Sequence, residues 1–465
     1  MTRSAQARAP GPDRRSARAP AVLRQWWAGK DWDPGDRAQV AIVSFSHAVQ
    51  HSYVAVLGIV YPFALAEFHS SYAVLGVILG IAGLAGGLLQ AMVGIVRRVQ
   101  TRTLLGAQNL AMAVVSGVGA LSPGIAVFGT ARLAGNLVSW PQHPVGSAYL
   151  TERVPGRRGL VLAAHTTGGN LGTLVTPLAA SAVLAAFGWR WALACFGVLM
   201  AAGGLLTWSR LDVGRPGAPA GGTRFPRSPE TGGRAEPART QSAQGRLEKE
   251  PGQPEKAPAQ PATEPPGSLA RALRRRPAVA VLVAGIVSAA GRGLGVLTTY
   301  IPAYLRSGLH QPPLVLGAVV TVVGIGAIGG PMIGGHLSDR LGRRPVLYTL
   351  YALGAVSLAG FVMVGSSPFA LALAGLAVGI FAYSEQPVRQ ALFSDAMHGV
   401  PPRAAFGAYF AISQSVGALW ITVIGFLITT AGFNVAFWVM GASFVLAGLV
   451  IAVFCRDAAR RPSTA

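Results

Sequence analysis

The stretch GGHLSDRLGRRPVLY, Gly334–Tyr348, places one carboxylate and three guanidinium groups between two apolar runs, Val315–Gly334 and Val346–Val364. Each run is close to the roughly 20 residues that a helix needs to cross the hydrocarbon core of a bilayer. The stretch therefore predicts a short charged loop between two membrane-spanning helices, and the remainder of the chain repeats this alternation.

Composition supports a membrane protein throughout. Hydrophobic residues make up 51% of the chain and charged residues only 12%, which leaves too little polar surface for a soluble globular protein. We expect an all-α membrane protein with twelve transmembrane helices in two parallel blocks of six. The first block is predicted at Val40–Phe63, Tyr72–Val96, Leu104–Leu121, Ile125–Leu150, Leu160–Phe187 and Trp191–Trp208. The second is predicted at Val279–Tyr304, Val315–Gly334, Val346–Val364, Phe369–Ala391, Ala404–Thr429 and Val435–Phe454.

The net charge of +22 is concentrated in the ends, the middle and every second loop. Arg190 and Arg306 fall in the opposite loops, and Arg132 and Arg292 fall within spans. This asymmetry is the positive-inside pattern, so both termini and the middle segment are predicted to face the cytoplasm from an inner (plasma) membrane. A basic patch for RNA or lipid headgroups is the alternative, but the distribution argues against a nucleic-acid partner.

Changes in composition divide the chain. The segments rich in Pro, Gly and charge cannot bury enough apolar surface to offset the entropy of ordering, so we expect them to be disordered. The predicted divisions are a basic cytoplasmic tail (1–37), a first six-helix half (38–208), a cytoplasmic linker (209–276), a second six-helix half (277–457) and a short tail (458–465).

An internal repeat relates the two blocks. A constant shift places Gly94 on Gly335 and Arg102 on Arg343, so the opening loop has a counterpart in the first half. Because each block contains an even number of spans, the two halves have the same orientation, as parallel repeats require. Such an architecture predicts a solute pathway between the halves.

The pattern G-x-L-S-D-R-x-G-R-R resembles the signature loop of the major facilitator superfamily. That resemblance implies an alternating-access transporter in which this loop helps to latch one state at the cytoplasmic interface between the halves, with Asp339 as the helix-terminus or ion-pair partner. The loop could instead serve only to fix the topology. The expected latch residues are Gly335, Asp339, Arg340, Gly342, Arg343 and Arg344. In the first-half counterpart Arg98 stands where the carboxylate should be.

Within that superfamily, the first half is similar to the fosmidomycin-resistance-type transporters. The likeness rests on SHAVQHSY at Ser46–Tyr53, RLAGNLVSWPQHPVGSAYL at Arg132–Leu150 and RRGLVLAAHTTGGNLGTLVTPL at Arg157–Leu178. That branch usually has an Asn-Asp pair where this chain has Gln50 and His51. Proton coupling through a carboxylate in the first span is therefore not expected.

The fifth span combines small residues with a proline. Gly168, Gly169 and Gly172 precede Pro177, and we expect them to form a flexible, closely packed helix at the interface between the halves. In the resembled branch a glycine normally precedes this proline, whereas here Thr176 does, which weakens an antiporter assignment based on this motif.

Ionisable groups within a membrane are costly and suggest function by default. His47 and His51 lie one helical turn apart in the first span, so they share a face and could relay protons, or they could be structural. Arg132 matches an arginine of the family in span four, and the resemblance implies a role in coupling or in attracting anions.

Span four continues into a proline-interrupted segment. Pro141 and Pro144 flank Gln142 and His143, and the carbonyl groups that prolines free need a wet or protein-lined environment at membrane depth. We therefore predict that Gln142 and His143 line the pathway, as could Asn170 in span five.

The second half offers Arg292 in span seven and Glu385 in span ten. Glu385 is the carboxylate that falls clearly inside a span. It could titrate during transport, or it could pair permanently with Arg292 or Arg132.

No nucleotide-binding loop, zinc-protease pattern or hydrolase elbow is present, so we expect neither an enzyme nor a cofactor or metal. The hypothesis is a monomeric secondary transporter of a small organic solute, coupled to protons and exporting a drug or metabolite. An uptake symporter, or a non-transporting receptor or scaffold on the same fold, is the alternative.

Overall fold

The computed structural model describes residues 33–91, 99–154, 157–212, 268–292, 295–400 and 402–455. These residues are mostly helical, and none of them lies in a strand. The first-half helices are α2 (Pro34–Glu67), α3 (Tyr72–Ala91), α4 (Thr101–Ala120), α5 (Ile125–Val138), α6 (Gln142–Arg153), α7 (Arg158–Phe187) and α8 (Trp189–Arg210). The second-half elements are α9 (Ser268–Leu273), α10 (Arg276–Arg292), α11 (Val296–Ala303), the π-helical turn η3 (Tyr304–Gly308), α12 (Pro313–Leu341), α13 (Arg343–Met363), α14 (Pro368–Ala396) and α15 (Pro402–Phe454).

The predicted fold class is confirmed. Nine segments among the described residues are long and apolar enough to cross a membrane. α15 holds two of the expected spans, which meet at Gly432, where φ is 86° and only glycine is comfortable. Adding the shorter α3 and the broken α5–α6 pair accounts for twelve spans in two sets of six.

Two predicted spans are each divided into two helices. Span four ends as α5 at Val138 and resumes as α6 at Gln142, directly after Pro141. Span seven ends as α10 at Arg292 and resumes as α11 after Gly295, which has a φ of 82°. Prolines and left-handed glycines interrupt the helical hydrogen-bond ladder, so both breaks have a local cause.

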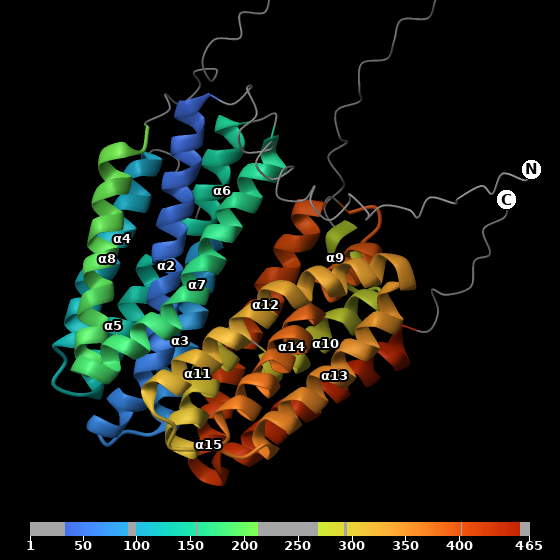
Figure 1. Cartoon of the computed structure of the whole chain (residues 1–465). Coiled ribbons are helices and arrows are strands. Elements are labelled where there is room, and N and C mark those ends of the chain that lie inside the picture. Colours follow the sequence, from blue (N-terminus) through green and yellow to red (C-terminus); the bar gives the residue numbers. More distant parts are fainter. Residues whose placement is uncertain are drawn as a thin grey trace, which may run out of the picture.

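The two halves lean together at one end and apart at the other (Figure 1). They meet where α3 packs on α15, α7 on α12, and α2 on α11. The α3–α15 contact joins span two to span eleven. Under the internal repeat these spans correspond to span eight and span five, which are α12 and α7, and these two helices also pack on each other. The interface therefore has the approximate twofold symmetry that the internal repeat predicts.

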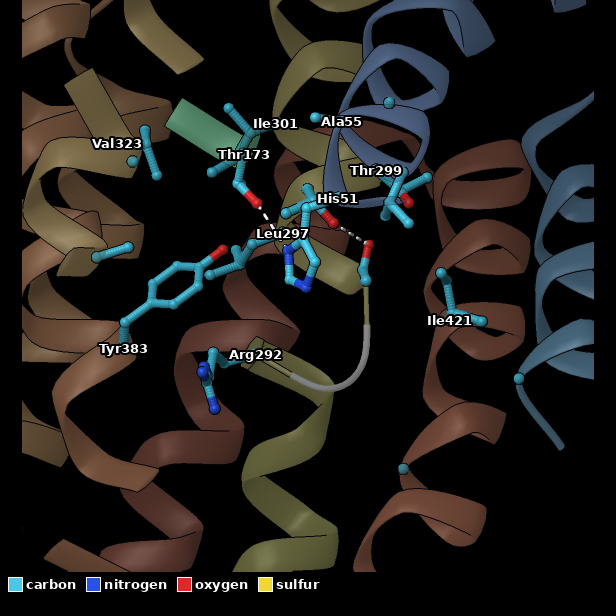
Figure 2. A pocket seen from close by; sticks show the side chains of 18 of the residues that line it. His51, Ala55, Thr173, Arg292, Leu297, Thr299, Ile301, Val323, Tyr383 and Ile421 are labelled. Carbon is cyan, nitrogen blue, oxygen red and sulfur yellow. Dashed lines mark hydrogen bonds between the residues drawn. The ribbon is translucent and has the colours of Figure 1, made fainter. Parts of the chain in front are cut away.

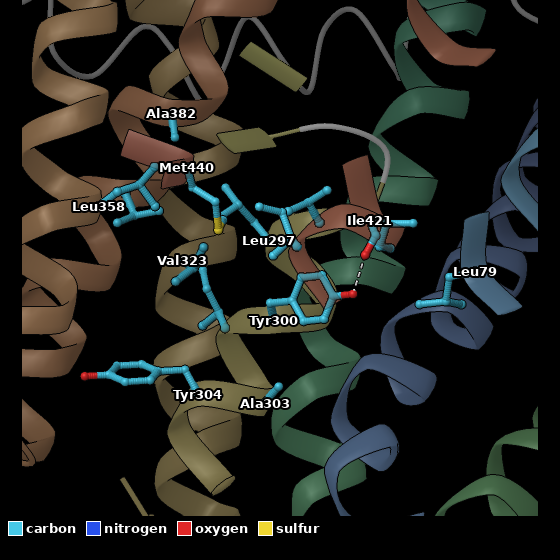
Figure 3. Packing of buried hydrophobic residues seen from close by; sticks show 14 of the residues in the cluster. Leu79, Leu297, Tyr300, Ala303, Tyr304, Val323, Leu358, Ala382, Ile421 and Met440 are labelled. Atoms are coloured by element: carbon cyan, nitrogen blue, oxygen red, sulfur yellow. Dashed lines mark hydrogen bonds between the residues drawn. The ribbon is translucent and has the colours of Figure 1, made fainter. Parts of the chain in front are cut away.

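The end at which the halves meet, here called the closed end, is well packed. Tyr300 of α11 is fully buried and donates to the carbonyl oxygen of Ile421 on α15 at 2.5 Å, with Leu79 of α3 nearby in the same cluster (Figure 3). The hydroxyls of Tyr72 and Ser307, from opposite halves, lie 2.7 Å apart. The Tyr300 bond braces α11 against α15 within the second half, and the Tyr72–Ser307 contact joins the halves at this end.

The glycines of the fifth span pack differently from the prediction. A Cβ on Gly168 or Gly172 would collide with the backbone carbonyl of Ser44 or Ala48 on α2, within the first half. The helix itself lies at the interface between the halves, where α7 packs on α12. Gly168 and Gly172, however, face away from that interface and bring α7 against α2. Further along α7, the carbonyl of Pro177 does face α12.

The limits of the predicted tails and linker change slightly. α2 begins at Pro34, inside the expected 1–37 tail. α8 continues to Arg210, and α9 forms within the expected 209–276 linker. Residues 1–32, 213–267 and 456–465, and the first-half loop position Arg98, lie outside the described residues.

Candidate functional site

A cavity of about 570 Å³ lies between the two halves. Both halves contribute charged or polar side chains to it, and six residues predicted for the pathway line it. Those six are His51, Arg132, His143, Asn170, Arg292 and Glu385. Figure 2 shows the ring of His51 and the side chains of Arg292 and Tyr383 directed into the same space.

The first-half wall places a guanidinium group inside the bilayer region. Arg132 of α5 donates from Nε to the hydroxyl oxygen of Tyr61 on α2 at 2.7 Å. No carboxylate pairs with Arg132 among the described residues, and Arg132 lines the cavity. The side chain is therefore positioned to attract an anion.

The second-half wall carries a second such group. Arg292, the last residue of α10, donates from one terminal nitrogen to Oε1 of Gln386 on α14. Its guanidinium carbon lies 4.8 Å from the ring centre of Tyr383, a cation–π contact. Both of these partners are neutral, and among the described residues no carboxylate lies within ion-pair distance of Arg292.

Glu385 is paired, but with neither of the predicted partners. Its carboxylate accepts from Nε and from a terminal nitrogen of Arg389, at 2.8 and 3.3 Å, and the two residues are 1% and 6% exposed. Residues four apart on a helix share a face, so α14 itself provides the pair. The expectation of pairing with Arg292 or Arg132 is wrong. Arg389 also lines the cavity, and it lies inside the predicted span Phe369–Ala391 without having been predicted as a site residue. The spacing of four from Glu385 would have revealed it.

Two predicted pathway residues do not line the cavity. Gln142 is fully buried, and its Oε1 accepts from Ser46 Oγ at 3.0 Å and from Gln108 Nε2 at 3.2 Å. These bonds join α6 to α2 and α4 inside the first half. His47 lies behind the cavity wall, where its ring lies against Gly169 and stacks on His165 with centroids 4.1 Å apart.

The predicted latch residues lie at the end of α12 and the start of α13. Gly342 joins these helices with a φ of 91°, a backbone conformation that glycine adopts easily and other residues rarely do. Arg343 bridges two carboxylates, Asp395 at 2.6 Å and Asp339 at 3.1 Å. Both carboxylates belong to the second half, so these contacts hold α12, α13 and α14 together and do not cross to the first half in this structure.

Comparison with known proteins now decides the family. The family description "Major Facilitator Superfamily" matches residues 43–311 and 281–465, which together cover most of the chain. The chain belongs to the Major Facilitator Superfamily. The chain is therefore a multi-pass membrane protein of this superfamily, and the members compared below are named as transporters.

Curated relatives within the superfamily match over part of their length. The chain is 30% identical over 182 residues to the proline/betaine transporter of Escherichia coli K12, covering 38% of this chain and 36% of that protein. It is 27% identical over 168 residues to the cis,cis-muconate transport protein of Acinetobacter baylyi, covering 35% and 39%. The chain therefore spans little more than a third of the length of each of these relatives.

Solved structures share the superfamily fold over nearly the whole chain. The nucleoside transporter NupG superposes with a TM-score of 0.67 at 12% identity, covering 91% of this chain and 100% of that one. A bacterial homologue of the human lysosomal transporter Spinster, in an inward-facing conformation, superposes with a TM-score of 0.63 at 14% identity, covering 93% and 100%. These likenesses concern the fold alone.

Proposed function

We propose that this superfamily member is a proton-coupled secondary transporter of a small organic anion that carries a carboxylate group. The observation that carries the proposal is the charge of the cavity, where three arginines face one carboxylate. Glu385 neutralises Arg389, and Arg132 and Arg292 are left with neutral partners. Guanidinium groups in a dry site bind carboxylates strongly and with defined geometry.

The curated relatives support the same substrate chemistry. Proline, betaine and cis,cis-muconate, the compounds in the relatives' names, all contain a carboxylate, which proline and betaine combine with a positive charge. A cavity with two arginines from opposite halves suits such a group, because each half can hold it in turn. A dicarboxylate could engage both arginines at once.

The Glu385–Arg389 pair suggests how a proton is coupled. Arg292 of α10, Tyr351 of α13 and Tyr409 of α15 surround this pair. Protonation of Glu385 would remove its charge and free Arg389 for the substrate carboxylate. Proton and anion would then bind together, which is the logic of a symporter and favours the uptake alternative.

Export remains the second candidate, supported by the resemblance of the first half to the fosmidomycin-resistance-type branch. That branch assignment and the inner-membrane location with cytoplasmic termini are part of this proposal. On that orientation, the end where α2 begins faces the cytoplasm and the structure is open toward it. Asp339, Arg340, Arg343 and Arg344 would then engage the first half only when this end closes.

The test is transport in vesicles that contain the purified protein. We would impose a pH gradient of either sign and follow a panel of labelled monocarboxylates, dicarboxylates and nucleosides. Accumulation of a carboxylate toward the alkaline side supports symport, and accumulation toward the acidic side supports export by exchange. Transport of carboxylates that ignores the gradient contradicts proton coupling, and transport of uncharged solutes alone contradicts the anion site.

Arg132→Gln and Arg292→Gln test the site directly. Losing a hydrogen bond to a charged group costs about 1.5–3 kcal/mol, or about a ten- to hundredfold weaker apparent affinity for the carboxylate. The matched control is Arg271→Gln, because Arg271 is an exposed arginine of α9 outside the cavity. Equal effects of all three changes would show that net charge, and not the cavity, determines affinity.

A further inference from the structure

Half of the histidines gather at one place in the first half. Of the eight in the chain, His69, His310, His336 and His398 are exposed. The other four come together from three helices, α2, α6 and α7, beside the cavity. They are His47, His51, His143 and His165.

Three of these rings bring nitrogen atoms close together. One ring nitrogen each from His47, His51 and His143 lies within 4.8 Å of the others. The ring centroids of His47 are 4.5 Å from His51 and 4.7 Å from His143, and the latter two are 5.6 Å apart. Three imidazoles have no reason to approach so closely inside an apolar helix bundle unless something joins them, because each adds a polar group to be satisfied.

Hydrogen bonds fix which nitrogen of His47 is available. Its Nδ1 lies 2.7 Å from the carbonyl oxygen of His165, which can only accept, so Nδ1 carries the proton. Nε2 then carries the lone pair. This atom is buried and has no hydrogen-bond partner among the described residues, in a side chain that is 4% exposed.

His51 is oriented in the same way. Its Nδ1 lies 3.0 Å from the hydroxyl oxygen of Thr173, and that hydroxyl donates to the carbonyl of Gly169 at 3.2 Å. Since the hydroxyl proton is already used, Thr173 accepts from His51, and Nε2 of His51 is free as well. A histidine that donates one N–H to an oxygen and offers the other nitrogen is the usual arrangement of a metal ligand.

We infer that His47, His51 and His143 form a binding site for a divalent transition-metal ion in the wall of the transport cavity. Imidazole nitrogens suit Zn²⁺, Co²⁺ and Ni²⁺, whereas Mg²⁺ and Ca²⁺ prefer oxygen ligands. Three histidines leave the fourth position of a tetrahedral ion open. Since His51 and His143 line the cavity, this open position faces the solute space.

Binding a metal ion requires the three imidazole rings to move slightly closer together. With metal–nitrogen bonds of about 2.0–2.1 Å, ligand atoms around a tetrahedral ion are roughly 3.3 Å apart, so a bound ion draws the three rings closer than they lie here. His143 is exposed to the cavity and can move most easily. Arg132 and Arg292 in the same cavity oppose a bare cation, and a carboxylate at the open position would offset this repulsion. The site stands whether or not the cavity transports carboxylates.

The test uses the full-length protein purified without a polyhistidine tag, with Co²⁺ as the probe. We expect one equivalent of Co²⁺ to give the intense visible absorption of a four-coordinate site, and Zn²⁺ to displace it. His51→Gln and His143→Gln should abolish this spectrum. Thr173→Val, which removes only the hydroxyl that orients His51, should weaken Co²⁺ binding by about 10–100-fold.

His336→Gln is the matched control, because it removes an exposed histidine and should leave the spectrum unchanged. Each variant is checked by size-exclusion elution and thermal unfolding, so that loss of the spectrum in a folded His143→Gln protein supports the site. Absence of a spectrum at saturating Co²⁺ in the unaltered protein would overturn the inference. An unchanged spectrum in His143→Gln would also overturn it. Neither result would decide whether the protein transports carboxylates, which the vesicle assay measures separately.

Discussion

Glu385 and Arg389 place two opposite charges inside the second half, at 1% and 6% exposure. Removing one partner of such a pair leaves the other charge without compensation and destabilises a protein by about 3–5 kcal/mol, whereas replacing both with apolar residues is often close to neutral. We therefore expect Arg389→Met to lower the unfolding temperature far more than the double change Glu385→Met/Arg389→Met. Thermal unfolding of the purified protein in detergent measures this.

The control for that experiment is the exposed pair of Arg343 and Asp339, whose side chains are 30% and 69% exposed. Exposed pairs contribute about 0–1 kcal/mol, so Asp339→Asn should hardly change the unfolding temperature. If the Glu385/Arg389 double change is as unstable as the Arg389 single change, the pair provides packing or hydrogen bonding that Met cannot replace, and its description as a charge pair fails.

At the residue scale, the sequence identified most of the cavity and missed its pairings. Glu385 and Arg292 stand out because any charge inside an apolar run is conspicuous. Arg389 is equally visible, since it lies inside the predicted span Phe369–Ala391, but we counted only Arg132 and Arg292 as arginines within spans. The histidine cluster depends on how α2, α6 and α7 cross, and no spacing along one helix encodes that crossing.

At the scale of helices, the crossing of α12 and α14 depends on individual glycines. A Cβ on Gly330 would lie 2.7 Å from the Cα of Ile380 and 2.7 Å from Oγ of Ser384, whereas a Cβ on Gly329 would have nothing within 4 Å. Gly330→Ala should therefore force the helices apart and lower stability. Gly329→Ala should raise it by about 0.4–1 kcal/mol, since alanine restricts the unfolded chain.

These two glycines are neighbours on one helix, so the two variants can be compared in the same protein, at the same depth in the helix and with the same change in helix propensity. Their unfolding temperatures, measured side by side, should move in opposite directions. Equal shifts would mean that α14 adjusts to the added methyl group and that the crossing is less constrained than its backbone contacts indicate.

The positions of the helices along the chain were easier to predict than which neighbouring helix each face contacts. Long apolar runs identify the spans, and Pro141 marks the break in span four. The sequence did not indicate that the glycines of α7 face α2, because small-residue spacing shows that something approaches closely but not which helix does. The same limitation applies to Gly330, whose partner α14 follows only from the three-dimensional arrangement.

For the whole molecule, the structure corresponds to one state of the alternating-access cycle that the proposed function requires. The halves touch at the closed end, while the ion pairs of Arg343 with Asp339 and Asp395 stay within the second half. On the proposed cycle, rocking would separate α3 from α15 and bring the latch end together. This gives the closed-end contacts a mechanical role that the repeat pattern alone could not assign.

A cross-link at the closed end tests this rocking. A Cβ on Gly80 of α3 would lie 3.7 Å from Cβ of Thr422 on α15, within the range of about 3.5–4.5 Å found in disulfides. Gly80→Cys/Thr422→Cys, in a background where the free cysteines Cys195 and Cys455 are serine, should form a disulfide on mild oxidation. Because the closed end could no longer separate, transport in vesicles should stop, and a reductant should restore it.

The extent of cross-linking can be measured with a protease site placed in the 209–276 linker, since cleavage separates the halves on a gel unless the disulfide joins them. Gly80→Cys alone controls for the cost of the new side chain and should be insensitive to oxidant. Undiminished transport at complete cross-linking would mean that the α3–α15 contact persists through the cycle. The moving interface would then have to lie elsewhere, with α7–α12, its symmetry-related counterpart, as the next pair to cross-link.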